Sequence, residues 1–87
     1  MNLTEYYDEY WRVRGDNFDT SRLEIIAARI KPGDDVLEVD CGPGVLAAMM
    51  AARGATGRGT DMSQVAVARA IAKGVPCQQV DLDSEPL

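Results

Sequence analysis

Histidine is absent from this chain, and only two of its 87 residues are cysteine. With no histidine, and with Cys41 and Cys77 far apart in the sequence, the clustered nitrogen and sulfur ligands of a zinc site are missing. Two isolated cysteines are more typical of free thiols than of a disulfide framework. The sequence therefore indicates neither a zinc protein nor a small disulfide-rich scaffold.

Long apolar runs and clusters of basic residues are also missing. No stretch has the length and apolarity needed to cross a membrane, and the acidic N-terminus does not resemble a signal peptide, so we expect a cytoplasmic protein. The net charge of −5 argues against a nucleic-acid partner, because such binding depends on clustered Lys and Arg. Arg12 and Arg14 form the densest basic spot, which is too small for such a surface.

The chain has the length of one small domain, in which we expect N-terminal helices over residues 1–33. The first predicted helix covers residues 4–14 and carries most of the aromatic side chains. The second begins at Ser21, which forms a capping box with Glu24, and it stops at Pro32.

Residues 34–87 alternate between strand and helix patterns. Strands are predicted at 35–39, 57–61 and 76–82, with helices at 45–53 and after Ser63. The buried stripes of the two helices are predicted to be Leu46, Met49 and Met50, and Val65, Ala68, Ile71 and Ala72. This alternation predicts an α/β fold with a Rossmann-like partial sheet, parallel strand order 3-2-1 and flanking helices.

A glycine turn follows the first predicted strand and leads at once into a helix. Strand, glycine loop and helix in this order present backbone N–H groups to a ligand, and Asp61 closes the second strand. The segment 42–47 also fits the dinucleotide pattern G-x-G-x-x-G/A. Glu38 and Pro43 disfavour that interpretation, because Pro43 removes a backbone donor and Glu38 suits a ligand with an ammonium group.

Residues 38–44, Glu-Val-Asp-Cys-Gly-Pro-Gly, resemble motif I of the class I S-adenosylmethionine-dependent methyltransferases, E/D-x-G-x-G-x-G. Residues 59–63 resemble the second motif of this family, and residues 79–82 resemble the third. Together with Lys73-Gly-Val-Pro76, these segments are most similar to the MetW-like branch, which is associated with methionine biosynthesis. The resemblance implies that residues 34–87 are the cofactor-binding half of the fold.

The resemblance also implies roles for individual acids. Asp61 is expected to hold both ribose hydroxyls, for which a carboxylate is well suited, with a helix-capping role as the alternative. Glu38 is expected to anchor the ammonium group, unless it is only a polar strand end. Asp81, or Asp83 in its place, is expected to reach the adenine. The expected cofactor contacts are Glu38, Asp40, Cys41, Gly42, Gly44, Asp61, Met62, Asp81 and Leu82, with no catalytic residue among them.

Asp40 stands where the family has its first glycine. A carboxylate there is expected to weaken cofactor binding by opposing the carboxylate of the ligand, unless it points to solvent. A further alternative groups Glu38, Asp40, Asp61 and Asp81 into a Mg²⁺ site. The aromatic residues of the first helix, Tyr6, Tyr7, Tyr10 and Trp11, are expected either to cover the cofactor or to pack the helix.

The sequence thus predicts the cofactor-binding part of an S-adenosylmethionine-dependent methyltransferase with an unknown acceptor. A non-catalytic methyltransferase-like binding module and an NAD-binding dehydrogenase fragment are the alternatives. Because the resemblance covers only the first half of the family fold, strand 35–39 is expected at an open sheet edge. The chain is then a fragment of a longer protein, a homodimer through this edge, or one part of a complex.

Overall fold

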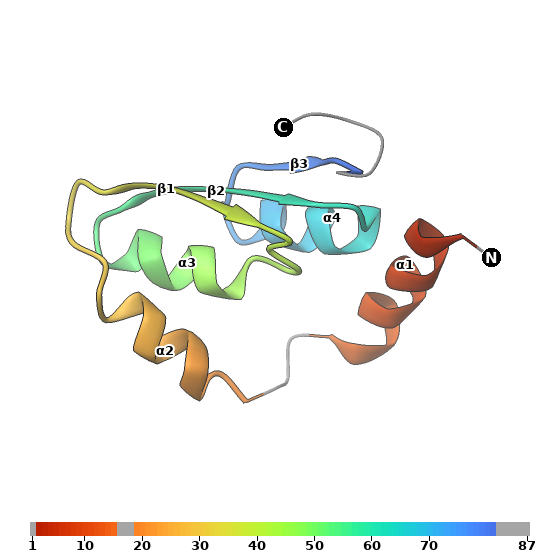
Figure 1. Cartoon of the computed structure of the whole chain (residues 1–87), viewed down its shortest axis with the longest axis horizontal. Helices are drawn as coiled ribbons and strands as arrows, with labels where there is room; N and C mark the ends of the chain where they lie inside the picture. Colours follow the sequence, from red (N-terminus) through yellow and green to blue (C-terminus); the bar gives the residue numbers. More distant parts are fainter. Residues whose placement is uncertain (1, 16–18, 82–87) are drawn as a thin grey trace.

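The computed structural model describes residues 2–15 and 19–81, which form two helices followed by alternating strands and helices (Figure 1). The elements are α1 (Leu3–Arg14), α2 (Ser21–Ala27), β1 (Asp35–Val39), α3 (Val45–Ala52), β2 (Thr56–Asp61), α4 (Gln64–Ala72) and β3 (Cys77–Gln79). The predicted order of elements is confirmed. The third strand is shorter than predicted, and Leu82 and Asp83 lie outside the described residues.

The three strands form one parallel sheet in the order β1-β2-β3, which confirms the predicted order 3-2-1. The central strand β2 is poor in strand-forming residues, but two of its glycines lie under neighbouring elements. A Cβ atom built on Gly57 would lie 3.5 Å from the carbonyl oxygen of Ala47, and one on Gly59 would lie 2.6 Å from Cys41 Sγ. Gly59 therefore allows the loop after β1 to approach the sheet closely, whereas a Cβ atom at Gly57 would make only an ordinary contact with α3.

Helices α3 and α4 lie on one face of the sheet, and α2 packs against α3 (Figure 1). The buried cluster on this side consists of Ala27, Leu46, Ala47, Met50, Ala70 and Val75. No helix of the described ranges covers the opposite face, where Leu37 and Val39 are 44% and 42% exposed. Strand β1 is at the edge of the described sheet, as predicted.

Two predictions about helix ends and faces were wrong. Ser21 is not the N-cap of α2, because Thr20 holds that position and Asp19 Oδ1 accepts hydrogen bonds from the backbone N–H and the hydroxyl of Ser21 at 2.9 and 2.7 Å. In α4 the buried residues are Ala66, Val67 and Ala70 rather than the predicted stripe.

Close packing explains which face of α4 is buried. Ala70 lies under the glycine loop, where a Cβ atom on Gly44 would be only 2.8 Å from Ala70 Cβ. A larger side chain at residue 70 would push the helix away from the loop. The bulkier Ile71 therefore points outward and is 55% exposed.

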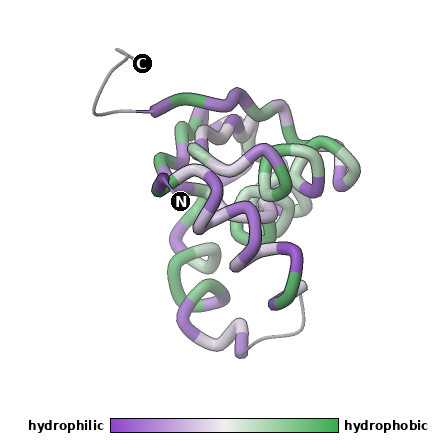
Figure 2. Tube along the Cα trace, turned by 90° about the vertical axis from the view of Figure 1, so that its right-hand side faces the viewer, coloured by the Kyte–Doolittle hydropathy of each residue, from purple (hydrophilic) through white to green (hydrophobic). Residues whose placement is uncertain are grey.

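Helix α1 lies beyond the carboxyl ends of the strands and packs on α4 (Figure 1). It has no buried residue, and Figure 2 shows that hydrophilic residues make up much of it. Polar contacts fix its position: the Ser63 hydroxyl donates to Asp8 Oδ1 at 2.7 Å, and the Arg69 guanidinium donates to the carbonyl oxygen of Trp11. Neither α1 nor any other helix of the described part is long and apolar enough to cross a membrane.

Candidate functional site

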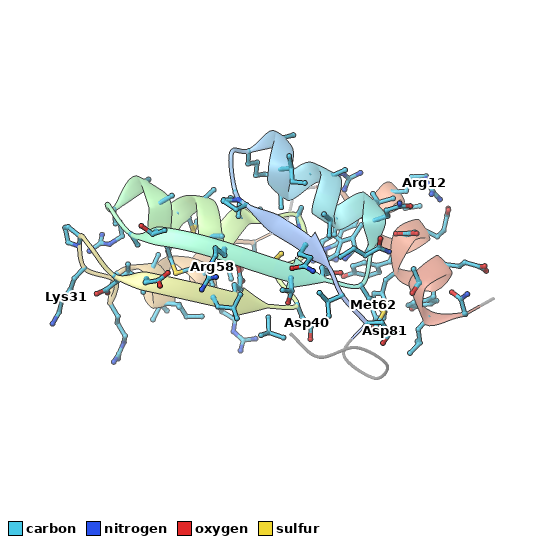
Figure 3. All side chains as sticks on the ribbon, turned by 90° about the horizontal axis from the view of Figure 1, so that it is seen from above. Arg12, Lys31, Asp40, Arg58, Met62 and Asp81 are labelled. Carbon is cyan, nitrogen blue, oxygen red and sulfur yellow. The ribbon has the colours of Figure 1, made fainter. Side chains whose placement is uncertain are left out.

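The loop after β1 and the carboxyl end of β2 are in direct contact. The backbone N–H of Cys41 donates to the carbonyl oxygen of Thr60 at 2.9 Å, and the N–H of Gly42 donates to Asp61 Oδ2 at 2.9 Å. Figure 3 shows Asp40, Met62 and Asp81 at this same end of the sheet. The structure therefore brings together the glycine loop and the acid that the sequence analysis joined in one site.

Asp61 connects three parts of the fold through its buried carboxylate. Besides accepting from Gly42, it accepts a hydrogen bond from the backbone N–H of Ser63 at 2.9 Å through Oδ1. Ser63 in turn is the N-cap of α4. The helix-capping role that was the alternative for Asp61 therefore describes its bond to Ser63 but not its bond to Gly42. A carboxylate has about four acceptor positions, and these two backbone donors leave room for two more, such as a pair of ligand hydroxyls.

Glu38 has a buried oxygen with no hydrogen-bond partner among the described residues, Oε1. Its side chain extends from β1 beside Gly59 of β2, on the face that α3 covers. Burial raises the pKa of Glu38 from its ordinary 4.5 to about 7; the N–H of Ala47 opposes this shift, and the charge of Asp61 adds to it. Glu38 is therefore a carboxyl group that a cationic ligand could both pair with and ionise.

The glycines of the loop adopt left-handed conformations, with φ of 56° at Gly42 and 80° at Gly44. A Cβ atom on Gly42 would lie 2.8 Å from Trp11 Cζ2, so this glycine allows the indole ring to rest on the loop. Gly44 allows the approach of Ala70 described above. Each glycine thus has a packing role of its own, apart from any role in ligand binding.

Asp40 also adopts a left-handed conformation, with φ of 56°, and it is the one residue other than glycine that does so among those described. Aspartate is one of the residues that tolerate this region, so the turn of the family motif forms without its glycine. The Asp40 side chain is exposed, in agreement with the alternative that it points to solvent.

Two cavities adjoin these residues. The larger, of about 270 Å³, lies between α1 and the strand ends and is lined by Leu3, Tyr7, Trp11, Asp40, Asp61 and Met62. The smaller, of about 170 Å³, includes Glu38 and Gly42, and Trp11 and Asp40 border both. Tyr7 and Trp11 therefore lie on one face of α1, and Trp11 both packs on the loop and forms a wall of the candidate site.

The segment after β3 runs beside the end of β2. The backbone N–H of Val80 donates to the carbonyl oxygen of Asp61 at 3.0 Å, and Gln79 Nε2 donates to that of Met62 at 3.1 Å. Asp81 is half-buried in this segment but does not line either cavity in the described part of the chain. Leu82 and the alternative acid Asp83 fall outside the described residues.

Asp8 positions α1 beside the candidate site, a role that the sequence analysis missed. Its Oδ1 accepts from the Ser63 hydroxyl and from the backbone N–H of Val65 at 3.2 Å, and so fixes α1 over the cavity. These bonds hold the pKa of Asp8 below its usual value, in opposition to burial, which raises it. The partners are more than fifty positions apart, so no local pattern could have revealed the contact.

The Mg²⁺ alternative finds no support in this geometry. Within the described ranges, no three side chains of the His, Cys, Asp and Glu types come together as a metal site requires. The strand-end acids Glu38, Asp40, Asp61 and Asp81 therefore do not form such a cluster.

The parallel sheet, the glycine loop after its first strand and the acid that closes its second agree with the fold of solved S-adenosylmethionine-dependent methyltransferases. Residues 20–86 match the model of one family of this class, described as "Methionine biosynthesis protein MetW". The chain belongs to the MetW family. A comparison with curated proteins found no significant match.

Solved structures agree with this fold. An S-adenosylmethionine-dependent methyltransferase from Thiobacillus denitrificans aligns over 93% of the chain, with a TM-score of 0.72 and 23% sequence identity. Another from Geobacter sulfurreducens also aligns over 93% of the chain, with a TM-score of 0.70 and 24% sequence identity. The sugar N-methyltransferase KedS8 from Streptoalloteichus sp ATCC 53650 aligns over 100% with 0.61 and 26%. The chain covers 38%, 37% and 37% of these proteins, respectively, well under half of their length.

Proposed function

We propose that this chain is the cofactor-binding portion of an S-adenosylmethionine-dependent methyltransferase, with residues 34–87 forming the binding half and residues 1–33 supplying helices around it. The observation that supports this most strongly is the bond between Asp61 and the N–H of Gly42, which joins the acid at the end of β2 to the glycine loop. The similar proteins from Geobacter sulfurreducens and Thiobacillus denitrificans were solved with S-adenosyl-L-homocysteine.

In this proposal the adenosyl group occupies the larger cavity, between α1 and the strand ends. The remaining acceptor positions of Asp61 receive the ribose hydroxyls, and Glu38 pairs with the ammonium group. Cys41, Gly42, Gly44 and Met62 border these groups through the loop and the end of β2, and Asp81 and Leu82 are assigned to the adenine side.

The cofactor, when bound, supplies a methyl group on a sulfonium, and transfer to a nucleophile is an in-line displacement. Such a reaction depends on orientation and electrostatics more than on covalent help from the protein. The chain's own contribution is to bind and orient: Asp61 fixes the sugar, Glu38 fixes the amino-acid end, and the Tyr7 and Trp11 rings limit access of water. We assign no catalytic base to this chain.

Isothermal titration with S-adenosylhomocysteine tests the proposal. Wild type is expected to bind, and Asp61→Asn is expected to lose about tenfold to a hundredfold in affinity, because the bonds to the ribose lose their charged acceptor. Asp35→Asn is the matched control, since Asp35 is exposed at the opposite end of β1. Circular dichroism verifies that the variants fold, and equal affinity of a folded Asp61→Asn would contradict the ribose assignment.

A second candidate function is a non-catalytic methyltransferase-like binding module. The exposed carboxylate of Asp40, which borders both cavities in place of a glycine, favours it. If the chain is such a module, wild type is expected not to bind S-adenosylhomocysteine.

The dehydrogenase alternative is tested by a parallel titration with NADH. Light scattering tests whether the open edge of β1 pairs with a second copy: a dimer would support pairing, and a monomer would contradict it.

A further inference from the structure

The two cysteines, distant in the sequence, meet in the fold. Cys41 Sγ lies 3.4 Å from Cys77 Sγ, which is van der Waals contact, and both are free thiols. Cys41 belongs to the loop after β1 and Cys77 begins β3, so the pair bridges across the central strand β2. A disulfide requires the two sulfurs to approach from 3.4 Å to about 2.05 Å.

Gly59 of β2 creates the space in which the thiols meet. It is paired in register with Cys77, and a Cβ atom built on it would lie 2.6 Å from Cys41 Sγ and 3.6 Å from Cys77 Sγ. Any side chain at residue 59 would therefore clash with Cys41. The arrangement depends on the three residues together.

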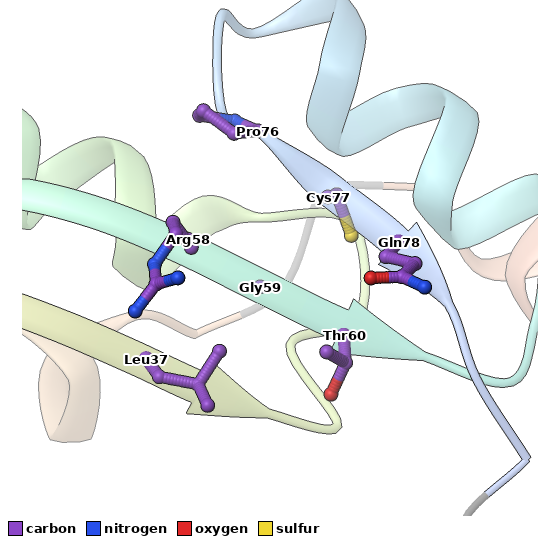
Figure 4. A pocket seen from close by; sticks show the side chains of 7 residues that line it. All are labelled: Leu37, Arg58, Gly59, Thr60, Pro76, Cys77 and Gln78. Atoms are coloured by element: carbon purple, nitrogen blue, oxygen red, sulfur yellow. The ribbon is translucent and has the colours of Figure 1, made fainter. Parts of the chain in front are cut away.

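The two thiols differ in accessibility. Cys41 is buried, whereas Cys77 is half-buried: it packs beside the buried cluster on the helix side of the sheet and also borders a cavity that Leu37, Arg58 and Thr60 line (Figure 4). Burial raises the pKa of both thiols, and the facing carboxyl groups of Glu38 and Asp61 raise them further. Reaction with an oxidant is therefore expected to begin at Cys77 and to be faster at alkaline pH.

We propose that Cys41 and Cys77 form a site of reversible disulfide formation that ties the glycine loop to β3. The oxidant is a low-molecular-weight disulfide such as oxidised glutathione. The Cys77 thiolate attacks one of its sulfurs and releases one glutathione thiol; Cys41, after losing its proton, attacks the Cys77 sulfur of the mixed disulfide and releases the second. Two protein thiols are oxidised, and one external disulfide is reduced to two thiols.

The proposal is tested by equilibrating the full chain in glutathione redox buffers at about pH 8. One series is run in native buffer and a second in guanidinium chloride, and the fraction of disulfide is compared between them. Remaining thiols are alkylated and counted by mass spectrometry. Because the fold holds the sulfurs in contact, the native chain is expected to favour the disulfide about a hundredfold more than the unfolded chain does. By the same linkage, the oxidised chain is expected to melt at a temperature higher by on the order of ten degrees.

The cysteine variants distinguish closure from simple modification. Cys41→Ser is expected to stop at a glutathione adduct on Cys77, and Cys77→Ser is expected to remain largely unmodified because Cys41 is buried. Equal equilibria in native and denaturing buffer, or a native wild type that stops at the adduct, would overturn the proposal. The measurement requires no cofactor, so its outcome is separate from that of the proposed function.

Discussion

Replacing Glu38 with glutamine removes a carboxyl group that the fold holds largely buried with one oxygen unpaired. The pKa of Glu38 is raised from 4.5 to about 7, so the folded chain holds a proton that the unfolded chain has lost across this range. The free energy of unfolding therefore falls as pH rises from about 4.5 to about 7. At about 1.4 kcal/mol per pKa unit the upper limit is about 3.4 kcal/mol, and partial exposure reduces this to about 2 kcal/mol.

Urea unfolding of wild type and Glu38→Gln at several pH values measures this effect. Glu38→Gln is expected to lose most of the pH dependence between pH 4.5 and about 7, and above about pH 7 to be more stable than wild type by about 2 kcal/mol. Asp35→Asn again controls for loss of a negative charge on β1. A variant that keeps the wild-type pH profile, or is less stable than wild type at alkaline pH, would refute the reasoning.

The affinity for S-adenosylhomocysteine is expected to rise with pH, whereas the free energy of unfolding falls. The ammonium group of S-adenosylhomocysteine pairs with the ionised form of Glu38, so the affinity of wild type is expected to rise with pH up to about 7 and then level off. Glu38→Gln is expected to bind more weakly and without this dependence. Calorimetry in buffers of different ionisation enthalpy measures the proton released below about pH 7. Equal affinities of variant and wild type across the range would remove Glu38 from the ligand site.

Three further variants test other parts of the site. Asp40→Gly is expected to bind S-adenosylhomocysteine about fivefold more tightly in calorimetry, because repulsion between solvent-exposed like charges is worth on the order of 1 kcal/mol. Its unfolding free energy is expected to change by less than about 1 kcal/mol, since relief of the left-handed strain is offset by added chain entropy. Unchanged affinity would count against repulsion by Asp40. Asp8→Asn is expected to speed hydrogen exchange in α1, whereas Glu5→Gln is not, and because the pKa of Asp8 is lowered, the wild-type anchor is expected to persist to pH values below the ordinary 3.8. Equal exchange in Asp8→Asn and wild type would remove Asp8 as the anchor. Gly59→Ala is expected to lower the free energy of unfolding, measured in urea, by about 1–3 kcal/mol. The double variant with Cys41→Ala is expected to recover part of this loss, because the clash with Cys41 Sγ is gone. If the losses of the two single variants simply add in the double variant, the contact is contradicted.

Local chemistry was sufficient to predict the order of elements and the meeting of Asp61 with the glycine loop. The apolar run of β1, the glycines at its end and Ser63 before α4 each act within a few residues of the chain, and short-range patterns record such effects. Because parallel strands end at the same edge, the order of elements then placed Asp61 beside the loop. The contact of Asp61 with Gly42 confirms that placement.

Contacts between distant segments decided the features that the sequence analysis missed. The buried face of α4 depends on how closely Ala70 approaches Gly44, and the position of α1 depends on Asp8 and Ser63. The meeting of the two thiols depends on a missing side chain in a third element. Each of these contacts involves a small or polar residue whose partner lies in a distant part of the sequence. The periodicity of the sequence does not reveal that partner.

The motif residues have reasons to be present even without a ligand. Gly42 makes room for Trp11, Gly44 for Ala70, and Asp61 closes the loop onto the start of α4. A chain that had stopped binding a cofactor would still need these residues in order to fold. Glu38 differs from them, because one of its buried oxygens bonds to nothing in the described fold and its burial is costly. A ligand with a cationic group offsets that cost, which makes Glu38 the most informative residue for deciding between a cofactor-binding methyltransferase and a non-binding relative.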